Sequence, residues 1–311
     1  MARDPVVKTV RTPSRTGNQG ASQPQKQTKP QVATQHVAAK VTSPFTIRQV
    51  ARRQRYLKLL LYGMSGVGKT TLAGTSADVV LMRDILLINA EGGDLSIADK
   101  DIQEVGFDNF KALQPIHQFL QAHCRYRDNG DDEALRTLQD RVFAPLDDGG
   151  AAPLKRFRTV IVDSLTEVEA RCMNQLLGIT DRTRLDEESE SAEWSEYKKN
   201  HTMMLRVVRE FRDLPMHVIF ICGRRYTTDE TRKHKYSLDL TGQLALKVQG
   251  FVDMVGYYTQ SSGEDNKVER RLYVMPSTDG RYDAKHRYSA FKGQYFKDPT
   301  IGSILNDVNL L

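Results

Sequence analysis

Four short, nearly continuous apolar runs recur along the chain, separated by longer segments in which apolar and polar residues mix. They span residues 56–62, 85–90, 159–163 and 217–222. Runs of this length without alternation are typical of parallel strands that helices cover on both faces. The pattern therefore predicts an α/β fold with a mostly parallel sheet flanked by helices.

Two further segments show a clear period. Residues 192–213 carry apolar or aromatic side chains every three or four positions, which predicts a helix with this stripe in the core. The stripe consists of Trp194, Tyr197, His201, Met204, Val208 and Phe211. In residues 251–277 the period changes to two, with a polar turn at 263–266, and this indicates a C-terminal β-hairpin.

The net charge of +6 is concentrated at the start of the chain. Residues 1–50 hold eight Lys or Arg and one acid, which leaves 37 bases and 38 acids for the remainder. This segment has no aromatic residue before Phe45, so it buries too little apolar surface to offset the entropy of ordering. We expect a disordered basic arm at 1–50, serving either as a nucleic-acid contact or as a solubilising linker, and one folded domain at 51–311.

Membrane and metal-site signals are missing from the sequence pattern. No apolar run approaches the roughly 18 residues that a membrane span needs, so we expect a cytoplasmic protein without a membrane partner. Cys124, Cys172 and Cys222 are widely spaced and have no partner at metal-ligand spacing. We expect them to be reduced, structural thiols.

A glycine-rich stretch follows the first apolar run and fits the P-loop pattern G-x-x-x-x-G-K-[ST]. Its nine residues, Gly63, Met64, Ser65, Gly66, Val67, Gly68, Lys69, Thr70 and Thr71, are the expected nucleotide-binding residues. A strand before the loop and a helix from about Lys69 would aim backbone N–H groups at phosphates. Lys69 would reach the β and γ phosphates, and the Thr70 hydroxyl would bind Mg²⁺. The expected ligands are ATP and Mg²⁺.

Two acids end neighbouring apolar runs. Asp163 is expected to be the second Mg²⁺ anchor; the alternative is a cap for the helix that starts at Leu165. Glu91 is expected to accept a proton from the water that attacks the γ phosphate, or to hold that water. The alternative for Glu91 is a solvated acid in the loop with Gly92 and Gly93.

The order of these motifs resembles that of the RecA-like ATPases, in which an Ala-Glu pair ends the second strand. Three further segments, 209–225, 240–258 and 284–287, resemble bacteriophage core-only RecA-like proteins that act as single-strand annealing recombinases. The likeness covers roughly residues 56 to 290. It implies a RecA-like P-loop NTPase core that binds ATP, assembles on single-stranded DNA and promotes annealing or recombination in phage replication. It also implies a homo-oligomeric ring or filament, a single-strand-binding protein as a possible partner, and the host cytoplasm as location.

Lys285 and Arg287 lie two apart, so on a strand both would point to one face. The resemblance implies that such a pair reaches the ATP of the adjacent subunit and acts in catalysis there. The alternative is an exposed basic edge that discourages strand pairing.

The segment 224–240 is basic and contains tyrosines, and the resemblance places DNA-binding loops there. We expect Arg224, Arg225, Tyr226, Lys233 and Lys235 to bind DNA, the cations on phosphates and the tyrosine on a base. A charged surface loop without a partner is the alternative. Arg224 also stands near the position at which RecA has a polar amide that senses the γ phosphate.

Three functions remain open from the sequence. The leading one is a DNA-stimulated ATPase that acts in single-strand annealing or recombination. The others are a nucleotide or small-molecule kinase with the same P-loop, and a regulatory or assembly ATPase without DNA contact.

Overall fold

The structure is a computed structural model that describes residues 56–144, 150, 152–180, 182–184, 186, 191–228, 234–262 and 267–311. These residues belong to one compact unit, Arg52–Leu311. The expected arm at 1–50 and the expected turn at 263–266 lie outside the described residues.

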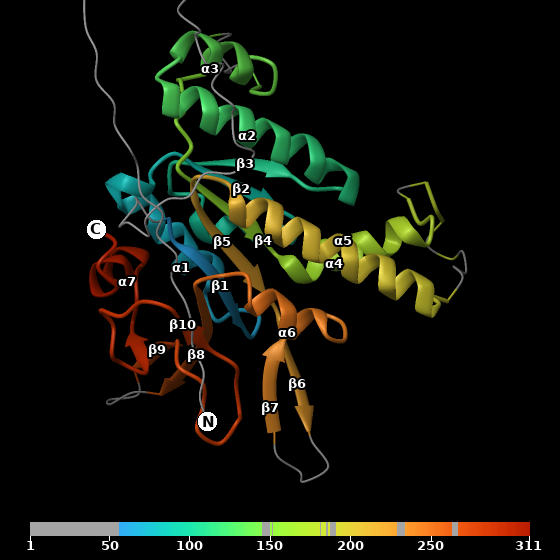
Figure 1. The fold of residues 1–311 in the computed structure, drawn as a ribbon, viewed down its shortest axis with the longest axis vertical. Coiled ribbons are helices and arrows are strands. Elements are labelled where there is room, and N and C mark those ends of the chain that lie inside the picture. The colour runs from blue at the N-terminus through green and yellow to red at the C-terminus, as the bar shows by residue number, and fades with distance from the viewer. Residues whose placement is uncertain are drawn as a thin grey trace, which may run out of the picture. The chain divides into compact units, whose positions relative to one another are not determined.

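The described residues form a nine-stranded sheet in the order β11-β9-β8-β1-β5-β4-β2-β3, with β10 paired to β8 (Figure 1). From β8 to β3 all neighbouring strands run parallel. The strands are β1 Lys58–Gly63, β2 Ile85–Asn89, β3 Ile102–Gly106, β4 Thr159–Asp163, β5 His217–Cys222, β8 Met254–Ser262, β9 Val268–Tyr273, β10 Lys285–His286 and β11 Tyr295–Lys297. A separate hairpin consists of β6 Arg224–Thr228 and β7 His234–Leu238.

Helices cover both faces of the sheet, and each face has its own buried core. The helices are α1 Lys69–Gly74, α2 Leu113–Asn129, α3 Asp132–Gln139, α4 Leu165–Leu176, α5 Trp194–Asp213, α6 Leu244–Gln249 and α7 Ile301–Asp307. Residues of α2, α4, α5 and α6 pack on one face, and residues of α1 and α7 on the other. Alternate residues of β1 supply the two cores: Leu60 and Tyr62 on one side, Leu59 and Leu61 on the other. The predicted α/β fold with a mostly parallel sheet flanked by helices is therefore confirmed.

The predicted elements agree with the structure except at two places. All four apolar runs are strands, and β8 and β9 form the expected antiparallel C-terminal hairpin. The stripe of α5 is not all core, because Trp194 and Tyr197 are 73% and 42% exposed while Met204 is buried. The first turns of α5 carry apolar side chains that the sheet does not cover. The expected DNA-binding loop is the β6–β7 hairpin, which projects from the sheet in Figure 1.

Candidate nucleotide site and nucleic-acid interface

The glycine-rich loop leaves the carboxyl end of β1 and enters α1, as the motif requires. Gly66 and Gly68 have φ angles of 76° and 95°, in the left-handed region where a side chain is strained. A Cβ on Gly63 would collide with the carbonyl oxygen of Tyr258 on the neighbouring strand. The glycines therefore allow a tight backbone curve next to β8, with room for a phosphate.

Lys69 is held over this loop. Its side chain is buried, and its Nζ donates to the carbonyl oxygens of Gly63 and Met64 at 3.2 and 3.1 Å. The cation therefore stands beside the backbone that would hold the β and γ phosphates.

Asp163 ends β4 and meets the P-loop helix. The Thr70 hydroxyl donates to its Oδ2 at 2.6 Å. The cap of α4 is Ser164, whose side chain accepts from the Glu167 N–H, so the helix-cap alternative does not describe Asp163. A hydroxyl and a carboxylate lie together where the site would take Mg²⁺.

Glu91 joins this pair through the backbone. The N–H groups of Ala90 and Glu91 donate to the Asp163 carbonyl oxygen at 2.6 and 3.2 Å, and the Glu91 side chain is exposed. Burial raises the pKa of the Asp163 carboxyl to about 6; the hydrogen bond from Thr70 and the charge of Lys69 oppose the shift, and Glu91 adds to it. Glu91 is therefore close enough to influence the Asp163 carboxylate, and it faces solvent from which a water can come.

The donor set suits Mg²⁺ bound together with a nucleotide. Mg²⁺ uses one or two carboxylates with substrate phosphates and waters, and Thr70 with Asp163 matches that need. No group of three or more His, Cys, Asp or Glu that could hold a metal occurs among the residues that the structure describes.

The β6–β7 hairpin follows the carboxyl end of β5 and has two different faces. Tyr226 pairs with Tyr236 across the hairpin, and the Arg224 guanidinium lies 4.3 Å from the Tyr236 ring centroid. Arg225 and Lys235 alternate with these residues and form ion pairs with Asp239 and Asp283, both at 3.1 Å. Lys233 lies outside the described residues. Of the cations predicted to bind DNA, Arg225 and Lys235 thus lie on the face opposite Tyr226, whereas Arg224 shares the face of the tyrosines.

The aromatic face continues onto the sheet as a row of tyrosines that sequence reasoning did not identify. Neighbouring ring centroids of Tyr226, Tyr236, Tyr257, Tyr282, Tyr273 and Tyr295 lie 5.0–5.6 Å apart. Tyr226, at one end, is 51% exposed. The row draws its six members from six separate segments, so no local sequence pattern reveals it.

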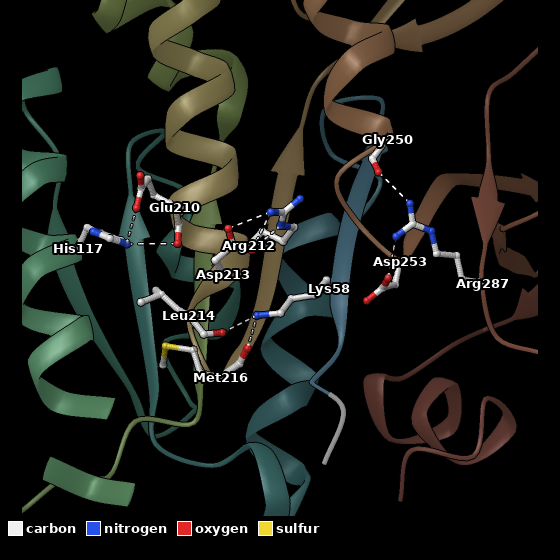
Figure 2. A network of polar contacts seen from close by, with 10 residues as sticks. All are labelled: Lys58, His117, Glu210, Arg212, Asp213, Leu214, Met216, Gly250, Asp253 and Arg287. Atoms are coloured by element: carbon white, nitrogen blue, oxygen red, sulfur yellow. Dashed lines mark hydrogen bonds and ion pairs between the residues drawn. The ribbon is translucent and has the colours of Figure 1, made fainter. Parts of the chain in front are cut away.

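Lys285 and Arg287 lie apart from the nucleotide loop. Lys285 pairs with Val255 near the start of β8, while the P-loop follows the end of β1, which runs parallel to β8. Figure 2 shows the Arg287 guanidinium bound to the Asp253 carboxylate at 3.1 Å and to the Gly250 carbonyl oxygen at 2.9 Å. The two cations are therefore placed at the opposite end of the sheet from the nucleotide loop of their own subunit.

A partly buried polar link connects α4 with the hairpin, and it was not expected from the sequence. The Thr166 hydroxyl accepts from the Gly223 N–H at 2.9 Å and donates to the Asp239 carbonyl oxygen at 3.1 Å. Thr166 lies three residues after Asp163. The link therefore joins the start of α4, just after Asp163, to both ends of the hairpin.

The three cysteines are free and buried, as expected. No helix within the described ranges is both long and apolar enough to span a bilayer.

The chain is similar to a known protein family and to several solved structures. Residues 55–288 match the sequence profile of a family described as AAA domain. No curated protein matches the chain. Among solved structures, flagellar accessory protein FlaH from Methanocaldococcus jannaschii is similar at 9% identity and a TM-score of 0.36, over 78% of this chain and 86% of that one. The RadB recombinase is similar at 15% identity and a TM-score of 0.36, over 78% and 87%.

Proposed function

This chain belongs to the AAA domain family, and from that premise we propose that it binds ATP with Mg²⁺ and hydrolyses it. The observation that carries the proposal is the meeting of Lys69, Thr70, Glu91 and Asp163 at one edge of the sheet. A phosphate-binding loop, a hydroxyl beside a carboxylate and a second carboxylate are the groups that ATP hydrolysis needs.

Each group has a separate task. The loop N–H groups hold the phosphates, and Lys69 offsets charge that develops on the β and γ oxygens. Thr70 and Asp163 would hold Mg²⁺, which neutralises phosphate charge when bound. Glu91 accepts the proton of the attacking water, because its exposed carboxylate lies beside the metal-binding acid.

We extend the proposal to single-stranded DNA, with annealing or recombination in phage replication as the process. The supporting observations are the resemblance in segments 209–225 and 240–258 and the exposed aromatic face of the β6–β7 hairpin. Tyr226 offers a ring on which a base can stack, and Arg225 and Lys235 are half exposed on the other face, where phosphates can reach them.

We further propose that the protein works as a homo-oligomer, a ring or filament. Lys285 and Arg287 lie at the opposite end of the sheet from the P-loop of their own chain, so any catalytic contact with ATP must be made across a subunit boundary. The ion pair of Arg287 with Asp253 would have to open for that contact.

The nucleotide site is tested by Lys69→Ala, with ATP binding measured by calorimetry and hydrolysis by phosphate release. The variant should lose hydrolysis and bind ATP more weakly, because it removes the cation beside the phosphates. Lys111→Ala, which removes an exposed cation elsewhere, is the control. Chelation of Mg²⁺ should stop turnover of the unchanged protein. Equal hydrolysis by the Lys69→Ala and unchanged proteins would contradict the proposal.

A further inference from the structure

Arg270 on β9 lies beside the P-loop. Gly63, the last residue of β1, pairs with Tyr258, and Gln260, two residues further along β8, pairs with Arg270. The register therefore places Arg270 beyond the carboxyl end of β1, where the loop begins. Its Nε donates to the Val67 carbonyl oxygen at 3.4 Å.

The backbone of Arg270 is fixed from the side opposite β8. Its N–H donates to the Asp298 Oδ1 at 2.8 Å, and its carbonyl oxygen accepts from the Asp298 N–H at 2.7 Å. Asp298 directly follows β11, which pairs with β9. The side chain is thus presented to the loop by a strand that is held on both edges.

The Arg270 guanidinium is available for an anion. It is exposed, and no carboxylate among the described residues forms an ion pair with it. The neighbouring cations Arg271 and Lys297 differ, because both are paired with Glu269. A guanidinium has five N–H donors, and a single bond to Val67 leaves donors for a phosphate.

The strand order sets the side of the P-loop from which Arg270 approaches. Asp163 and Glu91 approach the P-loop from the β4 and β2 side, whereas Arg270 approaches from the β8 and β9 side. A Cβ placed on Gly68 would lie 3.6 Å from the Arg270 Nε and 3.9 Å from the Thr71 Oγ1. Arg270 therefore lies on the side of the loop opposite the one from which Asp163 and Glu91 approach.

We propose that Arg270 binds the α phosphate of the nucleotide held by the P-loop of its own subunit. The proposal rests on the proposed nucleotide binding and adds a residue to it. The contact holds the nucleotide whether or not a γ phosphate is present. Lys285 and Arg287, in contrast, are expected to act in catalysis on the ATP of the adjacent subunit.

The test compares Arg270→Ala with Lys267→Ala, which removes an exposed cation near the start of the same strand. Dissociation constants for ATP and ADP are measured by calorimetry, and pyrophosphate is measured as a competitor of ATP. Arg270→Ala should weaken ATP and ADP equally, by about ten-fold, the usual order for a charge-assisted contact. Pyrophosphate can occupy the β and γ positions alone, so its competition constant should not change. Lys267→Ala should bind all three as the unchanged protein does.

Other results overturn the proposal in distinguishable ways. A matching loss for pyrophosphate would show that Arg270 only braces the loop through Val67. If Arg270→Ala weakened the binding of ATP alone, the side chain would lie at the γ phosphate. If it weakened the binding of neither nucleotide, Arg270 would not be part of the site. Failure of the unchanged protein to bind ATP would overturn the proposed function together with this inference.

Discussion

Two carboxylates lie at the proposed nucleotide site, and their surroundings differ. Asp163 is buried at the end of β4, and burial raises the pKa of its carboxyl to about 6. Glu91 is exposed to solvent. Such a contrast separates a metal ligand, which needs a fixed position, from a base, which needs access to water.

The assignment of Glu91 as the base predicts a specific defect. In Glu91→Gln the amide cannot accept a proton, so hydrolysis should fall by roughly 10²-fold or more while the dissociation constant for ATP stays within about two-fold. Single-turnover hydrolysis and calorimetric ATP binding measure the two quantities. Asp99→Asn, at an exposed acid on the segment that follows, should leave both unchanged. Turnover at the normal rate in Glu91→Gln would refute the assignment.

His217 gives the folded protein a definite pH response. Its Nδ1 accepts from the Leu57 N–H at 3.0 Å, and burial, followed by the nearby charge of Lys58, lowers the pKa of the imidazole to about 4. The folded pKa lies below the unfolded value of 6.5, so the unfolded state binds more protons between these values. The contribution of His217 to the free energy of unfolding should therefore fall as the pH is lowered from about 6.5 to about 4.

Denaturant unfolding at several pH values measures this effect. His217→Asn keeps an acceptor for Leu57 but does not titrate, so its loss of stability over this pH range should be smaller. His234→Asn, on the exposed hairpin, should behave as the unchanged protein. An identical pH profile for His217→Asn would contradict the role given to the buried imidazole.

At the scale of elements, the β6–β7 hairpin and α4 are joined by Thr166. Its hydroxyl bridges the Gly223 N–H and the Asp239 carbonyl oxygen, at the two ends of the hairpin. Asp239 also pairs with Arg225 on the hairpin. If nucleotide binding shifts the start of α4, the hydrogen bonds of Thr166 would pass that shift to the proposed DNA-binding element.

If Thr166 couples the two sites, a substitution there should weaken the coupling and leave each site intact. Thr166→Val removes both hydrogen bonds with little change in volume, so it should keep basal hydrolysis and DNA binding but lose most of the stimulation of hydrolysis by single-stranded DNA. We expect a destabilisation of roughly 1–3 kcal/mol from the unpaired Gly223 N–H, measurable by denaturant unfolding. Thr166→Ser should restore the stimulation. Full stimulation in Thr166→Val would show that the link is only structural.

Sequence patterns predicted the elements whose signals are local. A few consecutive residues are enough to recognise the continuous apolar runs of β1, β4 and β5 and the glycine-rich loop. The exposed first turns of α5 could not be predicted, because periodicity records which face is apolar and not how far the sheet extends beneath it. The position of Arg270 beside the P-loop and the row of tyrosines could not be predicted. Strand register and strand order bring these residues together, and the spacing of residues along the sequence does not show it.

At the scale of the whole molecule, the position of Lys285 and Arg287 predicts complementation between subunits. The double alanine variant lacks the proposed trans-acting cations, and Glu91→Gln lacks the base. In a mixture, some interfaces would join an intact Glu91 to an intact cation pair, so hydrolysis should exceed that of either variant alone. Phosphate release from mixed and separate variants measures this, after mixed assembly is shown by exchange of labelled subunits. Mixed assemblies without recovered activity would favour the alternative of a basic strand edge.

The most direct test of the account is the rate of ATP hydrolysis with and without a single-stranded oligonucleotide, measured on the unchanged protein and on Tyr226→Ala. We predict that DNA raises the rate for the unchanged protein. Because stacking on one aromatic ring contributes roughly 1–3 kcal/mol per base, Tyr226→Ala should need at least about five-fold more DNA for the same effect. Tyr226→Phe, which keeps the ring, should behave normally. The contradicting result is ATP hydrolysis that Lys69→Ala abolishes but that single-stranded DNA does not change. The protein would then be an ATPase, but the proposed action on single-stranded DNA would be wrong.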